Sequence, residues 1–195
     1  MRQEGGTLGG VEGWSPSARA LHWLAALGIL ALLALGLVMV NAPLGAAKKF
    51  DLYQWHKALG IIVLPLLLLR SLHRLATGRP PHLPATRLAA GAARLVHAAL
   101  HIVPLAMVAT GYLLASASVI PIPITLPLGI TVPLLGSPDL AREEVLKTAH
   151  HLLGFGLAML VGIHVGAALW HALVLKDGLL RRMVPAFRRQ PPAAA

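Results

Sequence analysis

Histidine is the residue through which this chain could do chemistry. The 195 residues include 10 histidines and no cysteine. Imidazole is the commonest transition-metal ligand among protein side chains and can also carry protons near neutral pH. The lack of cysteine excludes disulfides, thiolate catalysis, iron–sulfur clusters and covalent attachment of haem. What the histidines can do therefore depends on their spacing and on the segments that carry them.

Two of the histidines are spaced so that one helix face would carry both. His150 and His164 are 14 residues apart within one apolar segment. On an α-helix that separation is close to four turns, or about 21 Å along the axis. One helix would thus present an imidazole toward each of its ends.

The composition indicates which solvent surrounds these segments. Hydrophobic residues make up 56% of the chain, charged residues 12%, and the mean hydropathy is +0.71. A soluble domain carries roughly 25% charged residues. The polar surface is too small to cover a globule in water, so the chain is predicted to be an integral membrane protein.

Four segments each offer about 20 mostly apolar residues, the length that crosses a bilayer as a helix. They cover Leu21–Val40, Trp55–Leu75, Leu95–Ala117 and Thr148–Leu175. The second is the weakest, because Pro65 lies inside it, and Lys57 and Arg70 must reach the interface or face the protein interior. No cleaved signal peptide is expected, since the first apolar run begins only after two acidic residues.

The predicted fold is all-α, an integral membrane four-helix bundle. One domain is expected over residues 16–185, between an N-terminal segment at 1–15 and a tail at 186–195. Val119–Pro138 is apolar but contains four prolines before its last residue, so it should not form a membrane helix. We expect it to be an interfacial loop over the end of the bundle, with a re-entrant segment as the alternative.

The basic residues predict the orientation. The formal net charge is +10, and the positive charges lie between apolar runs rather than on one exposed face, which argues against nucleic-acid binding. The connection between the second and third segments and the C-terminal tail both hold arginines, and cytoplasmic loops of membrane proteins are enriched in such residues. Both termini of this multi-pass protein are therefore expected in the cytoplasm.

This orientation suggests how four histidines could pair. The second and fourth segments would both begin at the outer surface, so His56 and His150 could hold one iron. His22 and His164 would hold a second, closer to the cytoplasm. Two axial nitrogens leave no open position on a haem iron, an arrangement that suits electron transfer. Judged by depth alone, His171 could pair with His22 at least as well as His164.

The remaining histidines are not predicted to hold an iron. His97 and His101 could contact a haem propionate or a quinone headgroup, or simply pack at the interface. His73 and His82 are expected to be solvated, and His151 to be lipid-facing or to support a ligand indirectly. A lone intramembrane histidine is often only an interhelical hydrogen bond, but two on one helix face, each with a partner, favour haem.

Several short motifs in this order resemble the bacterial cytochrome b561 family over roughly residues 16 to 185. They are Ala-Leu-His22-Trp, Trp-His56-Lys-Ala-Leu-Gly, His97 followed by Thr110-Gly111-Tyr112, Leu146-Lys-Thr-Ala-His150, His164, and Lys176-Asp177-Gly178. The resemblance implies a four-helix inner-membrane protein with two b haems, ligated by His22, His56, His150 and His164. The resemblance favours His164 over His171 as the ligand that is paired with His22. The connection Val119–Pro138 lacks the aromatic residues expected in the family.

The resemblance also implies electron transfer to or from the quinone pool, in some members from superoxide. The leading hypothesis is a membrane electron carrier between a periplasmic donor and quinone, alone, as a homodimer or with a partner subunit. The alternative is a cytochrome b subunit that anchors a dehydrogenase or reductase. A histidine-lined metal transporter is disfavoured, because the apolar segments contain no Asp, Glu or Cys.

Overall fold

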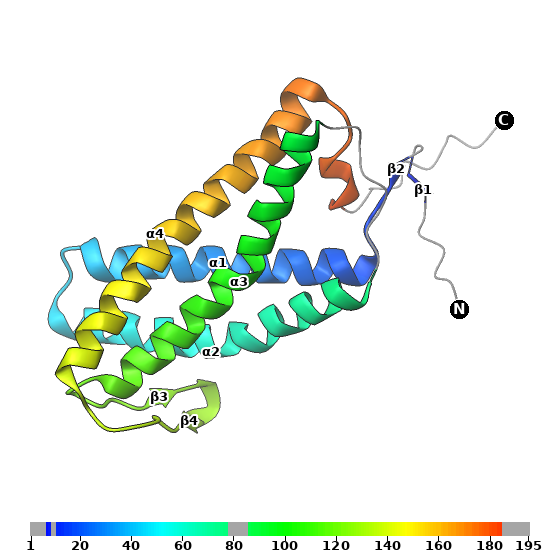
Figure 1. Ribbon diagram of the computed structural model, residues 1–195. Coiled ribbons are helices and arrows are strands. Elements are labelled where there is room, and N and C mark those ends of the chain that lie inside the picture. Colours follow the sequence, from blue (N-terminus) through cyan, green and yellow to red (C-terminus); the bar gives the residue numbers. More distant parts are fainter. Residues whose placement is uncertain (1–6, 9–10, 78–85, 185–195) are drawn as a thin grey trace.

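Four long helices dominate the computed structural model, which describes residues 7–8, 11–77 and 86–184 (Figure 1). They are α1 (Pro16–Asn41), α2 (Ala46–Ala76), α3 (Arg87–Ala117) and α4 (Leu140–Trp170). All four are long and apolar enough to cross a membrane, with mean hydropathies between 1.7 and 2.6 in their most apolar windows. The predicted all-α membrane fold is confirmed. His82 and the tail at 186–195 lie outside the described residues.

The helices begin before the apolar runs, and in three of them a capping side chain lies at the start. The hydroxyls of Ser15 and Thr86 and the carboxylate of Asp139 each accept a hydrogen bond from a backbone N–H in the first turn of α1, α3 and α4. Such caps satisfy N–H groups that a helix start otherwise leaves unpaired. Pro65 lies within α2 and does not interrupt it, as membrane helices tolerate.

The helices form two antiparallel pairs, α1 with α2 and α3 with α4, and α2 packs against α3. In Figure 1 the α3/α4 pair crosses the α1/α2 pair obliquely. A small core joins all four helices and contains Ala25, Ile29, Val63, Leu67, Leu100 and Leu157. Most other large apolar side chains are exposed, as expected for surfaces that face lipid.

The proline-rich connection between α3 and α4 is a hairpin rather than a helix, as its prolines predicted. Strands β3 (Ile124–Thr125) and β4 (Thr131–Val132) pair antiparallel around a short 3-10 turn. The Lys57 ammonium donates to the carbonyl of Ile122 at 3.3 Å, and the Tyr112 hydroxyl donates to that of Pro133 at 2.6 Å. The hairpin therefore lies over the end of the bundle formed by α2 and α3.

A second short hairpin precedes α1, with strands β1 (Thr7–Leu8) and β2 (Val11–Glu12). Neither hairpin was predicted as strand from the sequence. At this end of the bundle α4 continues as a π-helical turn at His171–Leu175 and a 3-10 turn at Leu180–Arg182. The Trp23 indole donates to the Met183 carbonyl at 2.9 Å, so the segment after α4 is held against the start of α1.

Candidate functional site

His56 and His150 face each other near the hairpin end of the bundle. His56 lies in the first half of α2 and His150 in the first half of α4, and their ring centres are 6.2 Å apart with an interplanar angle of 83°. Both side chains are half-buried. In the described part of the chain the buried Nδ1 atom of His56 has no hydrogen-bond partner. A buried polar atom of this kind calls for a partner that the protein does not supply.

Thr110 fixes the proton of the His150 ring. Its hydroxyl donates to the carbonyl of Ala106 at 2.9 Å or of Met107 at 3.1 Å. The Thr110 oxygen also lies 3.1 Å from Nδ1 of His150. Because the hydroxyl proton already points at a carbonyl, the oxygen accepts from Nδ1–H. The other ring nitrogen, Nε2, then keeps its lone pair and is available to bind a metal.

Two glycines leave room beside these imidazoles. A Cβ atom at Gly111 on α3 would lie 3.0 Å from Cε1 of His150, closer than ordinary van der Waals contact. A Cβ atom at Gly36 on α1 would lie 3.5 Å from Cε1 of His56, an ordinary contact distance. The His150 ring therefore depends on the missing side chain at Gly111, whereas the His56 ring has some clearance.

His22 and His164 form a second pair at the opposite end of the bundle. Their ring centres are also 6.2 Å apart, with an interplanar angle of 63°. His22 lies near the start of α1 and packs edge-on against Trp23, and His164 lies on the same helix as His150. The guanidinium of Arg70 on α2 donates to Nδ1 of His22 at 3.3 Å. A cation thus accompanies this pair.

The common separation of 6.2 Å is the spacing of two imidazoles on one metal. A metal–imidazole bond is about 2.0–2.1 Å long and the ring centre lies roughly 1.1 Å behind the nitrogen, so two rings on opposite sides of one ion have centres about 6.2 Å apart. Within the ranges that the structure describes, no group of three or more His, Cys, Asp or Glu side chains could hold a metal ion. The other ligands would have to come from a macrocycle, as in haem.

His97 and His101 accompany the second pair without matching this spacing. The ring centre of His97 is only 5.4 Å from that of His164, too close for two ligands of one iron, and the His97 side chain is exposed. Nδ1 of His101 is 3.0 Å from the Ser71 hydroxyl. His97 and His101 both lie on α3, on the side of the bundle end that holds the His22–His164 pair.

The other described histidines have different surroundings. His171 hydrogen-bonds Asp177. The pKa of the Asp177 carboxyl is lowered, first by the backbone N–H of Leu179 and then by His171. His151 is exposed, as expected. His73, expected to be solvated, is partly exposed and lies 3.0 Å from the Ser17 hydroxyl at the surface.

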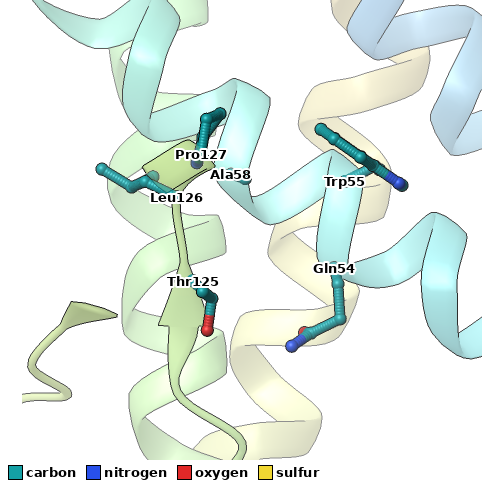
Figure 2. A pocket seen from close by; sticks show the side chains of 6 residues that line it. All are labelled: Gln54, Trp55, Ala58, Thr125, Leu126 and Pro127. Atoms are coloured by element: carbon teal, nitrogen blue, oxygen red, sulfur yellow. The ribbon is translucent and has the colours of Figure 1, made fainter. Parts of the chain in front are cut away.

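An apolar pocket of about 250 Å³ lies between α2 and the β3/β4 hairpin (Figure 2). Gln54, Trp55 and Ala58 line it from α2, and Thr125, Leu126 and Pro127 from the hairpin. His56 is two residues from Gln54, or about 200° around the helix. The pocket therefore opens on the opposite face of α2 from the His56–His150 pair and is not part of it.

Sequence reasoning did not find the roles of Thr110, Gly36 and Arg70. Thr110 was noted only as part of a motif, because nothing in a linear sequence shows that a hydroxyl on α3 faces a ring on α4. Gly36 resembles any small residue in a membrane helix. Arg70 did carry a signal, since an arginine bordering an apolar segment must reach the interface or find a partner inside the protein.

Comparison with known proteins agrees with this arrangement. The family model described as prokaryotic cytochrome b561 matches residues 13–186. Cytochrome b561 homolog 2 of Escherichia coli (strain K12) is 31% identical over 178 residues, which cover 89% of this chain and 92% of the relative. The family match extends over all four helices and both histidine pairs.

Proposed function

The chain belongs to the prokaryotic cytochrome b561 family, and we propose that it passes electrons through two b haems, one held by His56 and His150 and the other by His22 and His164. Membership of the family makes it a membrane cytochrome of the b type with a role in electron transfer. The number of haems, their ligands and the reaction partners are our proposal.

The observation that carries the proposal is the repeated pair geometry. Two histidine pairs from different helices have the same ring separation of 6.2 Å, and they lie at opposite ends of the bundle. Haem supplies reversible one-electron chemistry at its iron when bound. Histidines on both sides of that iron would leave no position for oxygen or another ligand, which would favour electron transfer over oxygen chemistry.

The distribution of charge supports an orientation for the two sites. The His22–His164 end carries many cations, including Arg19, Arg74, Lys176 and Arg181, whereas the hairpin end carries acidic and basic residues together. By the positive-inside rule the basic end faces the cytoplasm, so both termini would be cytoplasmic and His56–His150 would lie toward the periplasm. Reporter fusions after Asp139 and after Ala195 should report periplasm and cytoplasm respectively; the reverse result would invert the assignment.

We infer that the electron donor is periplasmic, with superoxide as a candidate, and that the partner within the membrane is quinone. A haem near each surface would let an electron enter from one compartment and continue toward the other. Anaerobic addition of quinol to the oxidised protein should reduce haem, as seen in the visible spectrum. Superoxide should also reduce haem, and addition of superoxide dismutase should prevent that reduction. A haem-loaded protein that quinol does not reduce would contradict the quinone assignment.

A further inference from the structure

Arg70 carries a cation among the histidines of the His22–His164 end. It lies on α2 and is half-buried. Its guanidinium is 3.3 Å from Nδ1 of His22, and it acts electrostatically on His22, His101 and His164. A charged side chain within a spanning helix is costly and normally has a partner of opposite charge. Arg70 therefore calls for a compensating anion nearby.

No carboxylate of the described chain serves as that partner. The ion pairs in the described ranges join Arg142 to Asp139, Lys147 to Glu144 and His171 to Asp177, and none of them includes Arg70. The groups around Arg70 are imidazoles, which are neutral or positive and cannot offer a formal negative charge. The compensating anion would therefore come from a bound molecule.

The contact between Arg70 and His22 cannot persist once His22 holds iron through Nε2. Arginine has only donors, so Nδ1 of His22 accepts in the present contact and the ring proton sits on Nε2. Binding of a metal at Nε2 moves that proton to Nδ1, which becomes a donor. Two donors then face each other, and Arg70 has to turn to another acceptor close by.

We propose that Arg70 binds a carboxylate of the haem held between His22 and His164. Haem b carries two propionate side chains, and the planar guanidinium fork is suited to binding a carboxylate through two parallel hydrogen bonds. The inference rests on the proposed function, because it needs a haem at this pair. It makes Arg70 a cofactor-binding residue on α2, a helix that contributes no histidine to this pair.

The two haems should differ in reduction potential as a consequence. Ferric haem carries one more positive charge than ferrous haem, so a nearby cation disfavours the ferric form and raises the potential. At the other pair the partner of His150 is the neutral Thr110 hydroxyl, and the Lys57 ammonium is directed at the Ile122 carbonyl. Arg70 would therefore raise the potential of the His22–His164 haem selectively.

The test compares Arg70→Gln and Arg70→Lys with the control Arg74→Gln in the purified, haem-loaded protein. Arg74 lies one turn further along α2, where it stacks on Trp14 and bonds the Thr77 carbonyl. Removing it deletes the same charge from the same helix at a residue whose contacts are with Trp14 and Thr77 rather than with a ring of the histidine pair. Haem content, the two midpoint potentials and the propionate bending band in the resonance Raman spectrum are measured for each variant.

Arg70→Gln should lower one of the two midpoint potentials and shift the propionate band, while Arg70→Lys should keep the potential near wild type but still shift the band. Arg74→Gln should change neither. If Arg70→Gln does not accumulate, Arg70→Lys decides the question through its propionate band. An unchanged band in Arg70→Lys, or unchanged potentials and band in Arg70→Gln, would overturn the proposal.

Two further outcomes separate the alternatives. A phospholipid phosphate could supply the anion instead of the haem. In that case delipidation in a phosphate-free detergent would abolish the effect of Arg70→Gln on the midpoint potential. The Arg70 substitutions would leave the propionate band unaffected. These results would also overturn the proposal. A wild-type protein with no haem would instead contradict the proposed function itself. Two haems in wild type with no response to Arg70 substitutions would contradict only the role of Arg70.

Discussion

The hydroxyl of Thr110 connects α3 to the proposed iron ligand on α4. It accepts from Nδ1–H of His150 at 3.1 Å while donating to a backbone carbonyl. Thr110→Val removes the acceptor oxygen but keeps the shape of the side chain, whereas Thr110→Ser keeps the acceptor oxygen. Loss of a hydrogen-bond partner behind a metal-bound histidine typically costs about 10–100-fold in metal affinity.

We therefore expect Thr110→Val to lower the affinity for one haem by about 10- to 100-fold and to shift its potential. Thr110→Ser should behave like wild type. Haem titration and potentiometry measure both effects. Equal haem affinity in Thr110→Val and wild type would show that the hydroxyl does not orient the His150 ring.

Gly111 and Gly36 offer a matched pair of substitutions. A Cβ atom would meet the His150 ring at 3.0 Å in the first case and the His56 ring at 3.5 Å in the second. Alanine also favours a helix over glycine by roughly 1 kcal/mol, so neither change should weaken the helix itself.

Gly111→Ala should thus displace the His150 ring and perturb the spectrum or occupancy of one haem, while Gly36→Ala should leave both haems intact. The ratio of haem to protein and the low-temperature visible spectrum provide the comparison. If both variants are indistinguishable from wild type, the close approach at Gly111 has no bearing on the site.

Glu143 attaches the proline-rich connection to α4. Its carboxylate accepts from the Val119 backbone N–H at 2.9 Å and from the Ser118 hydroxyl at 3.3 Å. Glu144, the next residue, only pairs with Lys147 at 3.5 Å on an exposed surface. Hydrogen bonds to a charged group contribute about 1.5–3 kcal/mol, and exposed ion pairs about 0–1 kcal/mol.

Glu143→Gln should therefore increase amide hydrogen exchange in the hairpin, and Glu144→Gln should not. Loss of protection by about 1–2 kcal/mol around residues 119–138 is expected in the first variant, since a neutral amide accepts more weakly than a carboxylate. Similar exchange in the two variants would indicate that the hairpin is held by its contacts with α2 and α3 alone.

The sequence predicted the four membrane helices because hydropathy reports directly on the lipid-facing surface. It did not predict where they begin, since Ser15, Thr86 and Asp139 act through local hydrogen bonds beyond the apolar runs. It identified the connection at Val119–Pro138 as non-helical from its prolines. It missed strands β3 and β4, each of two residues, because such short strands leave no alternating pattern.

The candidate ligands could also be predicted from the sequence, because they stand out within the apolar segments. Histidine is rare in apolar helices, and the 14-residue spacing of His150 and His164 follows from helix geometry. The choice between His164 and His171 needed either the family resemblance or the structure. Residue counts along α4 do not give depth when helices cross obliquely (Figure 1). The structure places His164 beside His22 and ties His171 to Asp177.

Each proposed iron site joins the two helix pairs. His56 and His22 come from the α1/α2 pair, and their partners His150 and His164 both come from α4. The side-chain core between the pairs is small. Anything that binds only the folded state stabilises it, so haem should contribute to holding the two pairs together.

If the four histidines act as two separate pairs, the ratio of haem to protein shows it most directly. Pyridine-haemochrome analysis should give two haems per chain in wild type. His56→Ala and His150→Ala should each leave one haem, as should the two combined, because both hold the same iron. His56→Ala combined with His164→Ala should leave none, and the neighbouring control His151→Ala should keep both. Loss of both haems in the His56→Ala/His150→Ala double variant, or loss of a haem in His151→Ala but not in His150→Ala, would contradict the pairing.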